Sequence, residues 1–184
     1  MSVKITYFVH GTTTDNEAHI SSGWKDVELS ELGIKQSEEL TEQTKDMKFD
    51  AIFTSDLKRA VNSANITWGK SSIPMFQDER LRECNYGDYN GKPSEEVEPL
   101  QEKSITAPMP NGESYEDVKK RIASFLEDLR KKYDGGHIAI VAHKAPQLAL
   151  DVLLRGKSWE SAFATDWRKE GKWQAGWEYI VGDN

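Results

Sequence analysis

The sequence predicts an α/β fold of three layers, in which a mostly parallel β-sheet is covered by helices on both faces. Stretches with the composition of strands and of helices alternate along the chain, which is the pattern of such a sheet. Two short apolar runs, residues 3–9 and 137–142, have the β-branched content of buried strands. The 184 residues contain no repeat and no linker rich in Pro, Gly or Ser, so we expect residues 1–184 to form a single domain.

The first half of the chain predicts two strands, each followed by a helix. Residues 3–9 form the first strand, and Ser30 begins a helix with apolar residues at helical spacing. Residues 49–53 form a second, short strand. The Ser-Asp pair at 55–56 is typical of a helix cap, so the next helix is expected over about residues 57–68.

The middle of the chain predicts an edge strand and a long loop region. Residues 73–76 have strand composition, but Pro74 cannot donate a hydrogen bond to a neighbouring strand, so the strand should lie at an edge. Residues 77–112 carry Pro, Gly and Asn and predict a long excursion over the sheet. Loops of this length in a compact domain are usually functional.

The last third predicts two helices and two strands. Ser114 begins a capping-box sequence with Asp in place of Glu, and the helix that follows ends at Gly135-Gly136. Residues 137–142 form the clearest strand of the chain. Pro146 fits the first turn of the next helix, and residues 177–181 form a final strand.

The composition excludes several classes of protein. A net charge of −7 argues against non-specific nucleic-acid binding, which needs a basic surface to neutralise phosphates. The single cysteine, Cys84, excludes an intramolecular disulfide and is consistent with a reducing compartment. The chain starts with too short an apolar run for a secretory signal and has none long enough to cross a membrane, so we expect a cytoplasmic protein without a membrane partner.

Two histidines follow directly after the two clearest strands. His10 ends the first of them and His143 the second, and ligands of open α/β sheets bind at the carboxyl ends of the strands. Either histidine alone would be interpreted as structural, but the pair favours function. After His10, Gly11 allows the backbone to approach a ligand, and three threonines and the Asn16 amide can donate to phosphate oxygens.

Two further segments carry groups that suit a phosphate ester. Arg59 lies in the first turn of the helix expected over 57–68, and its guanidinium matches a phosphate better than a lysine does. A solvated surface arginine is an equally good interpretation of that segment by itself. Residues 81–91 combine glycines and aromatics in the manner of a structured loop, where a carboxylate can serve as a general acid.

Motifs from these segments occur in a fixed order. They are His10-Gly11-Thr12-Thr13 with Asn16, Gly23-Trp24-Lys25-Asp26, Leu29 to Gln36, Ser55 to Ala60, Leu81 to Gly91, Gly112-Glu113-Ser114 and Val141-Ala142-His143. In this order the chain resembles the histidine phosphatase (phosphoglycerate mutase-like) superfamily, from the first strand to about Val152. Each motif alone is weak, but the series in register is specific. The resemblance implies the phosphoglycerate mutase-like form of the predicted fold.

The resemblance also implies a role for each residue. Neutral His10 would attack phosphorus and form a phosphohistidine, while Glu83 would protonate the leaving oxygen and then activate water. Arg59, His143 and Asn16 would bind the equatorial oxygens. The remaining phosphate-site and substrate-site residues would be Gly11, Thr13 and Gly23. No metal or other cofactor is implied, no Gly-x-Gly-x-x-Gly follows a strand, and the expected partner is a small phosphorylated substrate.

The sequence departs from the family pattern at two positions. Position 9, an arginine that contacts the phosphoryl group in the family, is Val9, and losing one such donor commonly costs ~10²–10³ in rate. The glycine that usually follows the second histidine is Lys144. Either Lys144 supplies the missing charge or it is an ordinary surface lysine. The chain retains the other family residues, which favours a modified enzyme over an inactive one.

Three functions remain in view. A phosphomonoesterase that acts through a phosphohistidine is the preferred one. A phosphoglycerate-type mutase is an alternative, because residues 22–24 are similar to the mutase substrate loop, although cofactor-dependent mutases are longer. The third is a non-catalytic or weakly catalytic domain that binds a phosphorylated ligand, a pseudo-phosphatase marked by Val9.

The C-terminal segment is rich in tryptophan and basic residues. The tryptophans are Trp159, Trp167, Trp173 and Trp177, and Arg168, Lys169 and Lys172 lie between them. Core packing is the simpler interpretation for most of them. Alternatively, Trp167 or Trp173 lines the pocket and offers a flat surface to an organic leaving group.

Overall fold

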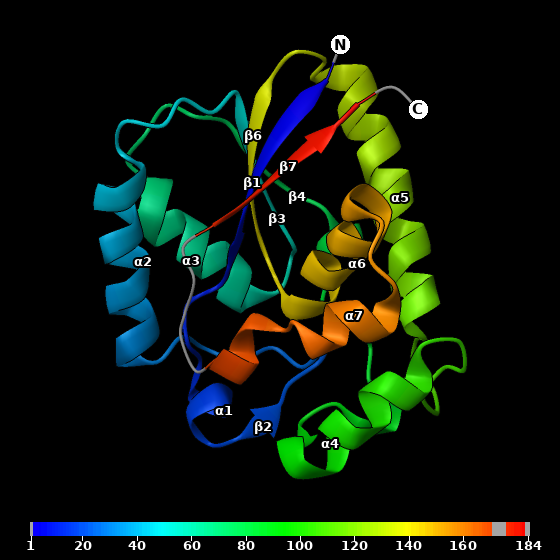
Figure 1. The fold of residues 1–184 in the computed structure, drawn as a ribbon. Helices are drawn as coiled ribbons and strands as arrows, with labels where there is room; N and C mark the ends of the chain where they lie inside the picture. Colours follow the sequence, from blue (N-terminus) through cyan, green and yellow to red (C-terminus); the bar gives the residue numbers. More distant parts are fainter. Residues whose placement is uncertain (1, 171–175, 183–184) are drawn as a thin grey trace.

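The computed structural model describes residues 2–170 and 176–182, and its centre is a five-stranded sheet (Figure 1). The strand order is β4-β3-β6-β1-β7, with every neighbouring pair parallel except β1 and β7. The strands are β1 (Val3–Val9), β3 (Ala51–Thr54), β4 (Met75–Gln77), β6 (His137–Ala142) and β7 (Trp177–Val181). The predicted mostly parallel sheet is confirmed, and β4 starts directly after Pro74 at one edge, as expected.

Helices cover both faces of this sheet (Figure 1). One face carries α2 (Glu31–Thr44) and α3 (Lys58–Trp68), and the other carries α5 (Tyr115–Lys132) and α6 (Lys144–Arg155), with α7 (Trp159–Ala164) beside α6. Side chains of a strand point alternately to the two faces, so Phe8 packs toward α2 and α3 while Tyr7 and Val9 pack toward α5 and α6. Burial of each large apolar side chain contributes about 1.5–3 kcal/mol.

The residues that cap the helices agree with two of the predicted helix starts and differ at a third. Ser30 accepts a hydrogen bond from the backbone of Gly33 at the start of α2, and Ser114 forms the predicted capping box with Asp117. The cap expected at 55–56 is wrong, because α3 has Leu57 as its N-cap, without a side-chain hydrogen bond. The serine and aspartate of that pair have other partners, His143 and Arg82.

Residues 77–112 are more ordered than a loop. They contain β5 (Lys92–Pro93), which pairs with β2 (Ile20–Ser21), the helix α4 (Ser94–Gln101) and three short 3₁₀ turns, η1 (Glu79–Leu81), η2 (Gly87–Tyr89) and η3 (Glu102–Ser104). Figure 1 shows α4 and β2, together with α1 (Thr14–Glu17), below the carboxyl ends of β1, β3 and β6. None of the described helices is long and apolar enough to cross a membrane.

Candidate active site

The two histidines meet because their strands are parallel neighbours in register. Val9 of β1 lies opposite Ala142 of β6, so the next residue of each strand, His10 and His143, leaves the sheet at the same edge. The backbone N–H of His10 donates to the carbonyl of Ala142 at 3.1 Å, and the centroids of the two imidazole rings are 5.1 Å apart.

The surroundings of His10 fix its tautomer and its charge. Nδ1 lies 2.7 Å from the carbonyl oxygen of Gly11, and since a carbonyl can only accept, Nδ1 carries the hydrogen. Burial, assisted by the positive charge of Arg59, lowers the pKa of His10 to about 3. The imidazole is therefore neutral near pH 7, with a lone pair on Nε2.

His143 is fully buried behind this ring. Its Nε2 is 2.6 Å from the hydroxyl of Ser55, whereas Nδ1 has no hydrogen-bond partner among the described residues. Burial, and then the charge of Arg59, lower the pKa of His143, so it too is neutral. A buried ring nitrogen without a partner is unfavourable, and a ligand oxygen beside it would relieve this cost if Nδ1 carries the hydrogen.

Arg59, from the first turn of α3, is a buried cation on uncharged partners. Its side chain donates to the carbonyl oxygens of Lys25 at 3.0 Å and Gly23 at 2.7 Å, and the residue is 3% exposed. Among the described residues no carboxylate forms a salt bridge with it. Burial therefore lowers the pKa of Arg59. A bound anion would supply the negative charge that these carbonyl partners lack.

Glu83 is held by three backbone N–H groups. One carboxylate oxygen accepts from Cys84 at 2.8 Å and Ala145 at 3.0 Å, and the other accepts from Lys144 at 3.2 Å. Two of these donors belong to the first turn of α6, where the helix dipole also favours a negative charge. The carboxylate thus has a fixed position at the sheet edge.

The loop that carries Glu83 is itself held in place by Arg121 of α5. This guanidinium donates to the carbonyls of Arg82 at 2.8 Å and Glu83 at 3.0 Å, and it pairs with Glu113 at 2.9 Å. The indole N–H of Trp24 donates to the Glu83 carbonyl at 2.7 Å. Arg121 was not predicted, because a basic residue on a helix face shows no sign in sequence of the carbonyls that it will meet.

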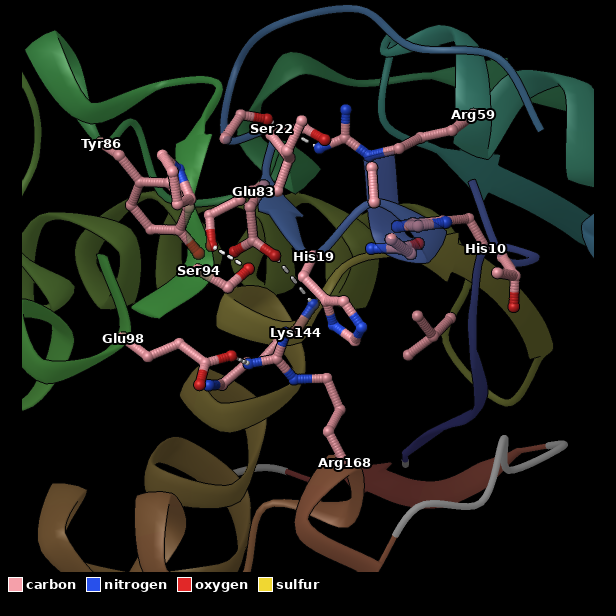
Figure 2. Close-up of a pocket in the computed structure, with 18 of the residues that line it drawn as sticks. His10, His19, Ser22, Arg59, Glu83, Tyr86, Ser94, Glu98, Lys144 and Arg168 are labelled. Carbon is pink, nitrogen blue, oxygen red and sulfur yellow. Dashed lines mark hydrogen bonds and ion pairs between the residues drawn. The ribbon is translucent and has the colours of Figure 1, made fainter. Parts of the chain in front are cut away.

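A cavity of about 1020 Å³ opens at this edge of the sheet. Of the predicted site residues, six line it: His10, Asn16, Gly23, Arg59, Glu83 and Lys144. Figure 2 shows His10, Arg59 and Glu83 reaching this pocket from three different segments.

Three predicted residues lie behind the cavity wall. His143 is covered by its neighbours, Gly11 is buried with its N–H on the Ser63 hydroxyl, and the Thr13 hydroxyl caps α1 by accepting from the Asn16 backbone. The oxygen of the Asn16 side chain accepts from the Thr13 N–H in return, which leaves the amide nitrogen of Asn16 for a ligand.

The start of α2 explains why small residues are needed beside His10. The Thr12 carbonyl accepts from the Ser30 N–H at 3.0 Å, and the Gln36 side chain accepts from the Thr12 N–H at 2.8 Å. A Cβ atom on Gly33 would collide with the Thr12 carbonyl oxygen, and one on Gly11 would collide with the Gly33 carbonyl oxygen. These contacts hold the backbone that follows His10.

Lys144 is not a surface lysine. It is 6% exposed, and its ammonium lies 2.8 Å from Asp166 and 2.9 Å from the Gln101 side-chain oxygen. Its charge is thus already paired with a buried carboxylate, which weakens the expectation that it supplies a free charge to the phosphate.

The C-terminal tryptophans divide between core and pocket. Trp159 is buried in the core, while Trp167, at the start of the 3₁₀ turn η4 (Trp167–Glu170), lines the cavity and packs against Trp177. Trp173 lies outside the described residues. The next residue of η4, Arg168, also lines the cavity, and sequence reasoning assigned it no role.

Comparison with known proteins agrees with this geometry. Residues 7–175 match the model of the histidine phosphatase superfamily (branch 1). An uncharacterized phosphatase, PhoE, of Bacillus subtilis is 33% identical over 141 residues, which cover 77% of this chain and 72% of that protein. A 2,3-bisphosphoglycerate-dependent phosphoglycerate mutase of Mesorhizobium japonicum is 31% identical over 175 residues, 87% of this chain and 85% of that protein.

A solved structure extends the similarity to the whole fold. Bacillus stearothermophilus YhfR superposes with a TM-score of 0.83 at 25% identity, covering 99% of this chain and 92% of that one. The predicted resemblance is confirmed, and the chain belongs to the histidine phosphatase superfamily, branch 1.

Proposed function

We propose that this chain is a phosphomonoesterase that hydrolyses a small phosphate ester through a phosphohistidine on His10. The observation that carries the proposal is the pairing of two features at one cavity. His10 is neutral with a free lone pair on Nε2, and Arg59 is a buried cation whose guanidinium hydrogen bonds go to carbonyl oxygens. A neutral imidazole is nucleophilic, and a buried cation at the same cavity attracts the phosphoryl oxygens.

In the first step Nε2 of His10 forms a bond to phosphorus while the bond from phosphorus to the ester oxygen breaks. Glu83 gives a proton to that oxygen, so the alcohol leaves neutral, and the backbone N–H groups of Cys84, Lys144 and Ala145 stabilise the carboxylate that results. The imidazole then carries a positive charge, which the Gly11 carbonyl stabilises through the hydrogen on Nδ1.

In the second step Glu83, now a carboxylate, takes a proton from water as the water oxygen bonds to phosphorus. The bond from phosphorus to Nε2 breaks, its electron pair returns to the imidazole and inorganic phosphate leaves. Glu83 suits this role because it is the buried carboxylate of the cavity wall, whereas Glu95 and Glu98 are exposed. Arg59 and the Asn16 amide, which line the cavity, bind the phosphoryl oxygens in both steps, while the buried His143 packs behind His10.

A mutase would share the first step and differ in what accepts the phosphoryl group. Several relatives carry that name, so the test must separate water from a second hydroxyl of the substrate as the acceptor. A panel of phosphate monoesters that includes phosphoglycerates does so. Free phosphate indicates hydrolysis, and isomerisation without free phosphate indicates a mutase.

The nucleophile is tested by labelling. Brief incubation with a substrate labelled in its phosphoryl group should place an acid-labile label on His10, and His10→Ala should abolish both the label and phosphate release. His137→Ala is the matched control, because His137 starts β6, the strand beside β1, at the end of the sheet away from His10. Label on a serine, or on His143, would overturn the assignment.

A further inference from the structure

The basic side chains on the cavity wall differ in how their charges are used. Among the described residues that line the cavity, the lysines and arginines are Arg59, Lys144 and Arg168. Arg59 has carbonyl partners, and the charge of Lys144 is paired with Asp166. The third is Arg168, and its contacts with other side chains are the longest of the three.

Arg168 is held loosely by two carboxylates. One terminal nitrogen of its guanidinium lies 3.6 Å from Glu98, and Nε lies 3.5 Å from Asp166. Good charge-assisted hydrogen bonds are about 2.7–2.9 Å long, so neither contact is strong. Glu98 is also 54% exposed, where an ion pair contributes little. In Figure 2 the side chain rises from η4 to the pocket between Glu98 and Lys144.

Asp166 connects Arg168 to the buried lysine. One of its oxygens accepts the Arg168 backbone N–H at 3.1 Å, and the other pairs with the Lys144 ammonium at 2.8 Å. Asp166 is 3% exposed, so this pair is a buried anchor for the start of η4. The charges of Lys144 and Asp166 are paired with each other at 2.8 Å. The guanidinium of Arg168 therefore has only longer contacts to carboxylates, at 3.5 and 3.6 Å.

We propose that Arg168 binds the phosphoryl group and supplies the positive charge that Val9 does not provide, with Lys144 and Asp166 as positioning residues. The proposal rests on the proposed function of the cavity. Val9 forms an apolar part of the same cavity wall beside His10, and it offers no donor to an anion. When a phosphate ester enters, the guanidinium exchanges its loose contact with Glu98 for the phosphoryl oxygens.

The electrostatics agree with this placement. The charge of Arg168 contributes to the lowered pKa of His10, after burial and Arg59. Burial disfavours the charge of Arg168, but Asp166 and other anionic groups around it more than offset this and raise its pKa. Arg168 is therefore permanently charged, and it lines the same cavity as His10.

The test compares Arg168→Ala with Lys169→Ala, which removes the neighbouring exposed charge outside this cavity. Calorimetric titration with inorganic phosphate and turnover of the best ester are measured for both variants. We expect Arg168→Ala to weaken phosphate binding at least about tenfold and to lower kcat/KM about 10²-fold, and Lys169→Ala to change neither. Arg168→Lys, which retains a charge but not the planar fork, should fall between them.

The second part of the test places a positive charge at position 9, at the end of β1, in variants with and without Arg168. Val9→Arg should gain little in the wild type but recover at least about tenfold in the Arg168→Ala background, giving a non-additive cycle. Unchanged phosphate binding in Arg168→Ala would overturn the proposal, and so would an equally weak double variant that melts at the wild-type temperature. If no ester is hydrolysed but Arg168→Ala still loses phosphate binding, the role of Arg168 stands and hydrolysis falls.

Discussion

Replacing Glu83 by Gln separates its structural role from its chemical one. The carboxylate accepts two hydrogen bonds on one oxygen and one on the other, from Cys84, Ala145 and Lys144. A glutamine has a single acceptor oxygen, so its NH₂ group would face one of these N–H donors. Loss of that bond with a donor left unpaired costs about 1–3 kcal/mol. For a domain of this size each kcal/mol lowers Tm by about 2–4 °C.

The chemical loss should depend on the leaving group. A general acid contributes ~10²–10⁴ in rate when the leaving oxygen is a poor one, and little when the departing group is stable as an anion. Glu83→Gln should therefore slow an alkyl phosphate by about 10²–10⁴ and 4-nitrophenyl phosphate by less than about tenfold. The assay is kcat for both substrates, well below the Tm of the variant.

The matched control is Glu95→Gln, which removes an exposed carboxylate from the same cavity wall. It should leave the ratio of the two rates unchanged. An equal loss on both substrates with Glu83→Gln would show that Glu83 only supports the loop, and the proton would then have to come from another group.

Two further predictions concern the buried titratable groups His10 and Lys144. The folded-state pKa of His10 is lowered to about 3 from an ordinary value near 6.5, so its contribution to stability is complete above pH 6.5 and is lost as the pH falls toward 3. Urea unfolding should lose about 1–2 kcal/mol more between pH 7 and pH 5 in the wild type than in His10→Asn, and equal losses would contradict the buried neutral imidazole. Lys144→Ala leaves the buried Asp166 with the Arg168 backbone N–H at 3.1 Å and a long contact to the Arg168 guanidinium, but without its close cation. It should cost about 3–5 kcal/mol in the same assay, whereas loss of a surface lysine would cost almost nothing.

The parts of the fold that the sequence predicted are those with a strong period or a local cap. β1 and β6 are short apolar runs, and α5 begins at a capping box that reads directly from Ser114 and Asp117. The small elements α1, β2, β5 and α4 were missed. They have two to eight residues, too few for an apolar period, and tertiary contacts below the sheet determine them.

The site was predicted to the extent that it follows the strands. His10 and His143 could be placed at one edge because each ends a strand, but their adjacency depends on the pairing of β1 with β6, which neither segment shows alone. Arg59 was a candidate from its place in the first turn of a helix, and the family resemblance added Glu83. Arg121 and Arg168 were left out, because each acts from a helix or turn that only the folded chain brings to the edge of the sheet.

The departures at positions 9 and 144 are best understood together. A lysine introduced alone into the buried first turn of α6 would be costly, since an unpaired charge there has no solvent. Asp166 removes that cost, and the same carboxylate binds the backbone of Arg168 at the cavity wall. With valine at position 9 the site has no cation there next to His10, while the segment that Asp166 and Lys144 anchor places Arg168 on the wall of the same cavity. On this reasoning Lys144 contributes to the phosphate site through Asp166 and not through its own ammonium, so removing both charges together should preserve the stability of the fold but not the binding of phosphate. The double variant Lys144→Met/Asp166→Leu should recover most of the stability lost in Lys144→Ala, yet bind inorganic phosphate as weakly as Arg168→Ala if the anchor is what positions the arginine. Phosphate binding at the wild-type level in that double variant would show that Arg168 needs no anchor.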